Sequence, residues 1–202
     1  MSQSAAMQML SSLLDLFPRD GLHAAAMEII DGASVPAPYH GLLVHRHHMT
    51  VTLEKHHGFK LDLVVESLKH LGADYARKIL LTAGPDRKIV LAGIMRLQLQ
   101  HCREEVRRQI VEQKIPLGRV LIEHKVLRWI EPCAYLKVRL DDGLREVFQA
   151  GPSAKVTFGR VARIICPSSL SSPSLPSPLT AASSRDEEPA VQLLEIVAPE
   201  AP

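Results

Sequence analysis

The sequence predicts an α+β fold built on a single antiparallel sheet of about six strands, with helices packed on one face. The first observation behind this prediction is that segments alternating apolar and polar residues are joined by tight-turn sequences. The second is that stretches with apolar residues at helical spacing interrupt these segments. A chain of 202 residues is also long enough to bury one substantial core.

The N-terminal part of the chain, residues 1–37, is predicted to be a helical extension of the main domain, residues 38–202. Apolar side chains recur at helical spacing in two short stretches, residues 11–17 and residues 21–30, which we interpret as peripheral helices. Gly and Pro mark residues 32–38 as the break between the extension and the domain.

The next part of the chain predicts a helix followed by three strands. Apolar residues near helical spacing predict a helix over residues 42–57, which ends at Gly58. Alternation then predicts strands over residues 59–68, 75–82 and 89–99. The sequence A-G-P-D-R between the last two strands contains the residues of a tight hairpin turn, so these strands should pair antiparallel.

Two helices are predicted to follow this hairpin. The first covers residues 102–112, which are rich in charged side chains. The second begins in the stretch Q-K-I-P-L-G-R-V-L-I-E-H, residues 113–124. Pro116 suits a first helical turn because it has no N–H to leave unpaired, and Gly118 has no side chain to keep a ligand from its backbone.

The remaining chain returns to β character and contains a long polar insertion. Strands are predicted over residues 126–140, 146–150 and 155–166, with Asp-Asp-Gly at 141–143 as a turn. Residues 167–188 are dominated by Ser and Pro, which predicts a loosely held insertion. Residues 191–197, V-Q-L-L-E-I-V, are too apolar and β-prone to remain in water, so we expect a last strand that re-enters the sheet.

The composition excludes several functional classes. The formal net charge is +2 and aromatic residues make up 4%, which is not the pattern of a nucleic-acid-binding surface. Three cysteines, distant from one another and outside any CxxC pair, are typical of reduced thiols in the cytoplasm. No apolar stretch is long enough to cross a bilayer, and the first residues lack a secretory signal pattern. We therefore expect a cytoplasmic protein with no nucleic-acid partner and no membrane insertion.

Five short motifs occur in an order and spacing that point to a known family. They are H-H-M-T, Y-A-R-K-I-L-L, K-I-P-L-G-R-V-L, F-G-R and P-A-V-Q-L-L-E-I-V-A-P. Together they resemble the chorismate pyruvate-lyase family over most of residues 42–199. The resemblance implies a monomer with a six-stranded antiparallel sheet whose site is closed by helical flaps. It also implies a lyase that converts chorismate to 4-hydroxybenzoate and pyruvate, a reaction associated with ubiquinone biosynthesis, without a cofactor or metal.

The resemblance assigns five residues to the site. Arg77 matches the arginine that pairs with a substrate carboxylate. Met49 matches a methionine in the pocket, and Leu117 with Gly118 matches the Leu-Gly whose backbone meets the ligand. Glu195 matches the buried glutamate at the other end of the pocket. Arg77 and Glu195 are thereby the expected catalytic residues.

The chemistry of chorismate agrees with these residue types. A guanidinium pairs with a carboxylate through two parallel charge-assisted hydrogen bonds, which Lys cannot reproduce. Glu195 can hold the ring hydroxyl or accept a proton. Transfer of the ring hydrogen onto the leaving enolpyruvate within the substrate would need no base, and both routes remain open.

Other interpretations of these residues remain open. Glu195 can instead face water from an edge strand, and Arg163 competes with it if the last strand covers residues 161–166. His45 and His48 have i, i+3 spacing but no HExxH motif accompanies them, so we predict no metal site. Cys102 lacks the neighbours of a nucleophile. The alternative to a lyase is a protein that binds an aromatic or carboxylated metabolite on the same fold without turnover.

Overall fold

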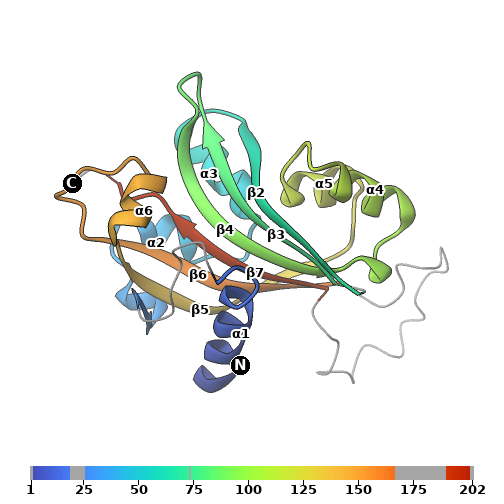
Figure 1. The fold of residues 1–202 in the computed structure, drawn as a ribbon, viewed down its shortest axis with the longest axis horizontal. Helices are drawn as coiled ribbons and strands as arrows, with labels where there is room; N and C mark the ends of the chain where they lie inside the picture. Colours follow the sequence, from blue (N-terminus) through green and yellow to red (C-terminus); the bar gives the residue numbers. More distant parts are fainter. Residues whose placement is uncertain (1, 19–25, 73, 167–189, 201–202) are drawn as a thin grey trace.

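The computed structural model contains one seven-stranded antiparallel sheet, and it describes residues 2–18, 26–72, 74–166 and 190–200 (Figure 1). The strand order is β1-β5-β6-β7-β4-β3-β2. The strands are β1 Met27–Ile30, β2 Leu61–Leu71, β3 Asp74–Ala83, β4 Lys88–Gln98, β5 Trp129–Arg139, β6 Val156–Ile165 and β7 Val191–Val197. The predicted α+β class with a single antiparallel sheet is confirmed, and the additional strand is β1.

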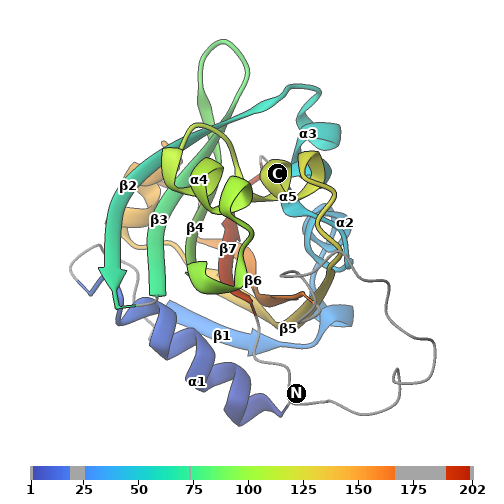
Figure 2. The ribbon, with the colours of Figure 1, turned by 90° about the vertical axis from the view of Figure 1, so that its right-hand side faces the viewer.

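The helices occupy both faces of this sheet. They are α1 Gln3–Leu14, α2 Tyr39–Leu43, α3 Met49–His57, α4 Glu104–Glu112, α5 Leu117–Glu123 and α6 Asp142–Val147, with two single 3-10 turns, η2 Gly32–Ser34 and η3 Leu99–His101. The sheet is strongly curved, and α4 and α5 lie in front of its concave side with α2 and α3 beside them (Figure 2). The predicted helical cover of one face therefore applies to α2 to α5, whereas α1 packs against the opposite face.

Both faces of the central strands are apolar, and this explains the two-sided cover. Along β7, Leu194 and Ile196 pack with Leu10 and Leu13 of α1, and all four side chains are essentially buried. Val197, which points to the other face, packs with the core beneath α2 and α3. A strand that buries both faces needs a layer on each side.

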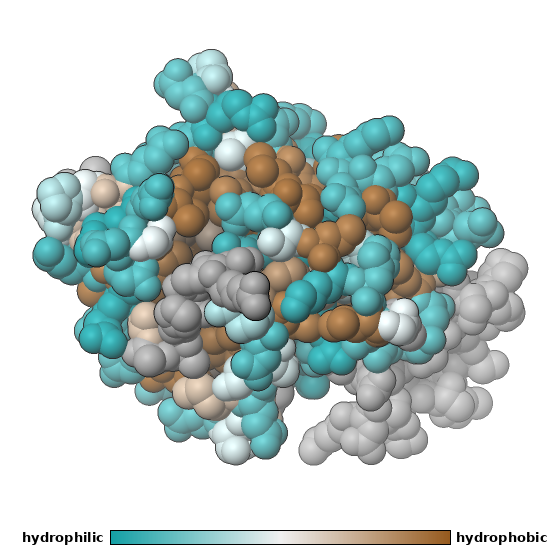
Figure 3. Space-filling model, viewed as in Figure 1, coloured by the Kyte–Doolittle hydropathy of each residue, from teal (hydrophilic) through white to brown (hydrophobic). Residues whose placement is uncertain are grey.

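The outer face of the sheet is covered by α1. This helix makes most of its contacts with β4, β5, β6 and β7, and Leu80 of β3 belongs to the same buried cluster. On this side, apolar side chains form a band over β2 to β4, surrounded by hydrophilic ones (Figure 3). No helix of the described ranges is long and apolar enough to cross a membrane.

Two of the predicted elements were assigned to the wrong class. The helix predicted over residues 21–30 is wrong from Met27 onward, because M-E-I-I forms β1 and pairs with β5. The strand predicted over residues 146–150 is wrong because α6 occupies Asp142–Val147. The Asp141 side chain accepts a hydrogen bond from the Leu144 N–H at 2.8 Å, which caps this helix at its N-terminus.

The helix predicted over residues 42–57 is interrupted. It ends as α2 at Leu43 and starts again as α3 at Met49. Residues 44–48 form a connection between them, and α3 stops at Gly58, whose φ of 73° is the left-handed conformation that glycine adopts most easily. The interruption matters because the connection lies against the site described below.

The last strand, β7, lies in the centre of the sheet between β6 and β4. Its observed bounds, Val191–Val197, are those predicted from the apolar run. The alternative in which Glu195 lies on an edge strand is thereby excluded. The Ser/Pro-rich insertion predicted at 167–188 lies outside the described residues. Upstream, β1 belongs to the predicted N-terminal extension and pairs with β5, so the extension contributes to this same sheet.

Candidate functional site

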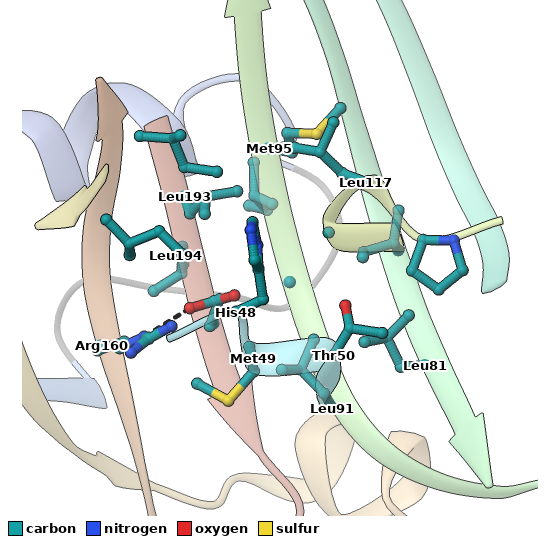
Figure 4. A pocket seen from close by; sticks show the side chains of 18 of the residues that line it. His48, Met49, Thr50, Leu81, Leu91, Met95, Leu117, Arg160, Leu193 and Leu194 are labelled. Carbon is teal, nitrogen blue, oxygen red and sulfur yellow. Dashed lines mark hydrogen bonds and ion pairs between the residues drawn. The ribbon is translucent and has the colours of Figure 1, made fainter. Parts of the chain in front are cut away.

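A buried cavity lies between the concave face of the sheet and the helices α3 and α5 (Figure 4). It offers about 50 Å³ in which the centre of a water molecule can lie, which is room for a few waters. All five residues that the family resemblance assigned to the site line it: Met49, Arg77, Leu117, Gly118 and Glu195. These residues come from four separate elements, so the cavity brings together positions far apart in the sequence.

The register of the sheet explains how the polar residues meet. Residues directly opposite each other on paired strands point to the same face. One row across the concave face contains Arg77, Met95 and Leu193. The next row contains Gly93 and Glu195, followed by Arg160 on β6. Arg77 and Glu195 thus lie two strands apart, roughly 10 Å between strand axes.

Arg77 is a buried cation with unused hydrogen-bond donors. Its side chain is fully buried on β3. Nη1 donates to the Ile110 carbonyl of α4 at 3.4 Å, while Nε and Nη2 have no hydrogen-bond partner among the described residues. Burial lowers the pKa of Arg77 below its ordinary value and the neighbouring Tyr75 hydroxyl partly opposes this, but an arginine remains protonated near neutral pH. An anion in the cavity is the natural partner for these two donors.

Glu195 is held by a second buried arginine, Arg160 (Figure 4). Arg160 Nε donates to Glu195 Oε2 at 2.6 Å, and the two side chains are 1% and 12% exposed. Its Nη1 donates to the carbonyls of Leu43 and His45 at 3.2 and 3.1 Å, and Nη2 to that of His47 at 3.5 Å. Arg160 therefore ties Glu195 to the connection between α2 and α3.

His48 and Met49 enter the cavity at the N-terminus of α3. Met49 is 4% exposed and packs with Leu53, so it is both a core residue and a wall of the cavity. The His48 Nε2 accepts a hydrogen bond from Arg128 Nε at 2.8 Å, which requires a neutral imidazole protonated on Nδ1. Burial, followed by the charges of Arg128 and Arg160, lowers the pKa of His48 to about 4.

The neutral state of His48 predicts a loss of stability in mild acid. The pKa of His48 is depressed in the folded protein, so the unfolded chain takes up the proton first as the pH falls below 6.5. The resulting loss of stability grows until the pH reaches about 4. Between pH 7 and 5, the free energy of unfolding of His48→Gln should fall less than that of the wild-type protein in urea titrations. His40→Gln, on the exposed side of α2, is the control that should follow the wild type.

Gly118 allows α5 to approach α3 closely. A Cβ at this position would lie 2.9 Å from Thr50 Oγ1 and 3.2 Å from His48 Nδ1. The sequence-based interpretation concerned ligand access to the backbone, and the structure adds the contact between the two helices. Leu117, the first residue of α5, is 8% exposed and lines the cavity beside it.

We expect Gly118→Ala to destabilise the protein by about 1–3 kcal/mol, because the new methyl group overpacks the contact with Thr50. Urea denaturation measures this change. Gly41→Ala in α2 is a matched control, since nothing lies within 4 Å of a Cβ there. That control should raise stability by up to about 1 kcal/mol, the usual helix preference for Ala over Gly. Equal effects of the two substitutions would contradict the close approach of α5 and α3.

Three residues of the cavity were not anticipated as site residues. Arg160 belongs to the motif F-G-R, and an arginine inside the apolar strand V-T-F-G-R-V-A-R-I-I is a signal of a buried partner. His48 was considered only as a metal ligand. Gly93 lies opposite Glu195, and a Cβ there would lie 2.9 Å from the Leu194 carbonyl. Without a side chain at Gly93, the floor of the cavity stays open between Arg77 and Glu195.

Two other residues considered from the sequence, Arg163 and Cys102, lie outside this cavity. Arg163 points to the opposite face of β6 from Arg160 and pairs with Glu131, Nε to Oε2 at 2.8 Å. Burial raises the pKa of the Cys102 thiol to about 11, which disfavours the thiolate that a nucleophile needs. Neither residue lines the cavity.

The histidines of the α2–α3 region have other partners. The His45 ring makes a 2.6 Å hydrogen bond with the Leu42 carbonyl, and the His48 ring is engaged by Arg128. Among the described residues, one group of possible metal ligands lies within 4.8 Å of one another: His56, His57 and Glu200. It lies at the C-terminus of α3, where His56 Nε2 is 3.2 Å from Glu200 Oε1.

Comparisons with known proteins assign no family. No family profile and no curated protein sequence matches the chain. Among solved structures, the effector domain of PhnF from Mycobacterium smegmatis is similar with a TM-score of 0.46 and 12% identity, over 75% of this chain and 88% of that domain. A second structure, PhnF from the same organism, has a TM-score of 0.43 and 11% identity, over 77% of this chain and 65% of that one. At these values, neither structure assigns a ligand or an activity to the protein.

Proposed function

We propose that the protein is a lyase that converts chorismate to 4-hydroxybenzoate and pyruvate in the cavity lined by Arg77 and Glu195. The observation that carries the proposal is Arg77, a fully buried cation whose Nε and Nη2 have no partner among the residues described. A buried charge without a counter-ion is costly, and a ligand carboxylate would supply both the opposite charge and two acceptor oxygens.

The walls of the cavity fit a ring with polar groups at opposite ends. Apolar side chains of Leu81, Leu91 and Met95 also line the cavity. The ring carboxylate would pair with Arg77 at one end. At the other end, Arg160 occupies Glu195 Oε2, so Oε1 is the oxygen available to the ring hydroxyl. A cyclohexadiene ring with a carboxylate and a hydroxyl on opposite carbons has this distribution of charge.

The reaction needs little more than this positioning. The C–O bond between the ring and the enolpyruvyl group breaks, the ring carbon that bears the hydroxyl loses its hydrogen, and the ring becomes aromatic. The enolpyruvyl fragment gains one hydrogen and leaves as pyruvate. Glu195 can accept the ring proton and pass it to the enolpyruvyl fragment, or the hydrogen can pass directly to that fragment while Glu195 only orients the hydroxyl.

Ligand access requires α3 and α5 to move apart. The cavity of about 50 Å³ is smaller than the roughly 300–1,000 Å³ of sites that enclose drug-sized ligands. The contact between Gly118 and Thr50 closes it on the helical side. Opening of such flaps would make product release a candidate for the slow step.

The test is incubation of the purified protein with chorismate. We expect 4-hydroxybenzoate and pyruvate in equal amounts, measured by chromatography and by a coupled lactate dehydrogenase assay. Arg77→Met protein is the control for contaminating activity and should form neither product above the rate without protein. Equal rates for the two proteins, or no product from either, would overturn the proposal.

The second candidate is binding of an aromatic carboxylate without turnover. It is favoured by the pairing of Glu195 with Arg160, which leaves no unpaired carboxylate base among the described residues of the cavity. Saturable binding of 4-hydroxybenzoate in calorimetry, lost in Arg77→Met and accompanied by no turnover of chorismate, would select this function.

A further inference from the structure

A wide groove opens beside the buried cavity. It measures about 750 Å³ and lies over the α2–α3 connection and the start of β5. Its lining residues are Arg46, His47, His48, Val51, Arg128, Trp129, Ile130 and Glu131. His48 and Ile130 line both the groove and the buried cavity, so the two spaces meet at these side chains.

The groove carries an excess of positive charge. Arg46 is exposed and Arg128 is half-buried, and neither forms an ion pair with a carboxylate of the described residues. The acidic side chain of the groove, Glu131, is neutralised by Arg163 at 2.8 Å. Two guanidinium groups without a carboxylate partner among the described residues, set in a concave surface, attract anions from solution.

Arg128 is held at the junction of the two spaces. Its Nε donates to His48 Nε2 at 2.8 Å, and Nη1 donates to the Val126 carbonyl. These two bonds orient the guanidinium plane, while Nη2 has no hydrogen-bond partner among the residues described. A donor oriented in this way loses little further freedom when it binds an oxyanion.

Among its described residues, the buried cavity has no second cation with free donors to bind a second carboxylate. Arg77 offers one set of free donors, whereas Arg160 is already occupied by Glu195 and three backbone carbonyls. The carboxylate of Glu195 would repel a further anion placed beside it. A ligand with two carboxylates therefore needs a second cation outside this cavity, and the Arg128 guanidinium bonded to His48 is one.

We propose that the groove is a second anion subsite, in which Arg128 and Arg46 bind the carboxylate of a short 2-oxo or enol acid. The assignment rests on the proposed function in one respect: the enolpyruvyl carboxylate of the substrate would lie there, and pyruvate would leave through it. The chemistry of the subsite is independent of turnover, because it needs only a small monocarboxylate and the two arginines.

Trp129 provides a direct test of this subsite. It is the single tryptophan of the chain, it is 49% exposed and it lines the groove. The test is to titrate the protein with sodium pyruvate at constant ionic strength, using sodium chloride as the reference, and to follow tryptophan fluorescence. The expected result is a saturable change with pyruvate.

Substitutions of the two arginines test whether pyruvate binds in the groove. Arg128→Gln should raise the apparent Kd for pyruvate by about 10-fold or more, the usual loss with one charge-assisted hydrogen bond. Arg46→Gln, at an exposed position, should weaken binding in the same direction. Arg108→Gln on the exposed side of α4 is the charge-matched control and should leave the Kd unchanged.

Arg77→Met separates this subsite from the buried cavity, because the fluorescence change with pyruvate should persist in that variant. The subsite is overturned if pyruvate gives no saturable change, if both Arg128→Gln and Arg46→Gln bind as the wild type does, or if the signal disappears in Arg77→Met. A protein that shows the pyruvate response but never converts chorismate would refute the proposed reaction and leave the subsite standing.

Discussion

Arg77→Met should make the ligand-free protein more stable while it abolishes ligand binding. Arg77 is fully buried, and two of its donor nitrogens have no partner among the described residues. Replacing an uncompensated buried charge with an apolar side chain of similar length should raise the free energy of unfolding by about 1 kcal/mol or more. Urea denaturation measures the stability, and calorimetry with 4-hydroxybenzoate measures the binding.

The kinetic consequence is the larger effect. Loss of a bidentate charge-assisted contact should lower kcat/KM for chorismate by about 100-fold or more. Arg77→Lys keeps a positive charge but not the planar fork, so its kcat/KM should fall by about 10- to 150-fold. Arg96→Lys is the matched control, because Arg96 lies on the neighbouring strand β4, pairs with Asp74 and does not line the cavity.

Two outcomes would contradict this account of Arg77. Wild-type kinetics in Arg77→Lys would show that the guanidinium does not bind the substrate. A lower stability of ligand-free Arg77→Met would show that Arg77 has a structural partner, and the argument from an uncompensated charge would be wrong. Together, higher stability and lost binding are the pattern of a residue kept for function.

Arg160→Met should destabilise the fold severely. The substitution leaves the Glu195 carboxylate buried without its partner, and it leaves the carbonyls of Leu43, His45 and His47 without the guanidinium. Breaking a buried ion pair by removing one member typically costs about 3–5 kcal/mol. Chemical denaturation should show a loss of this size, and the variant should bind no 4-hydroxybenzoate because the α2–α3 connection is released.

Substitutions of Glu195 distinguish the effect of its charge from the effect of its packing. Glu195→Gln keeps the shape of the side chain and leaves Arg160 bonded to the backbone, so it should cost less stability than Arg160→Met while it weakens catalysis. The double variant Arg160→Met with Glu195→Leu removes both charges and should recover part of the lost stability without activity.

Arg163→Met provides the control on the same strand. The Arg163–Glu131 pair is partly exposed, with side chains 26% and 32% accessible, and such pairs contribute about 1 kcal/mol or less. If Arg160→Met costs no more stability than Arg163→Met, the buried pair does not hold the α2–α3 connection. The same activity in Glu195→Gln as in the wild type would show that this carboxylate has no part in the chemistry.

Local sequence patterns were sufficient for most of the sheet. The hairpin between β3 and β4 follows from the residues A-G-P-D-R, because Gly, Pro and Asp favour the backbone angles of a tight turn. The bounds of β7 follow from its predominantly apolar, β-prone sequence, which has to be buried wherever it pairs. The resemblance to chorismate pyruvate-lyase named five positions, and the fold places all of them around one cavity.

Long-range packing decided the features that local patterns did not predict. The four residues of β1 are too few to specify a strand, and they become one because β5 supplies their hydrogen bonds. Arg160 and Glu195 are 35 residues apart, and only the pairing of β6 with β7 places them opposite each other. The sequence by itself therefore determined which segments form most strands and which residues the resemblance assigns to a site. Only the tertiary structure decided which buried charge is paired and which has donors without a partner among the described residues, because that depends on contacts between distant strands rather than on local backbone preference.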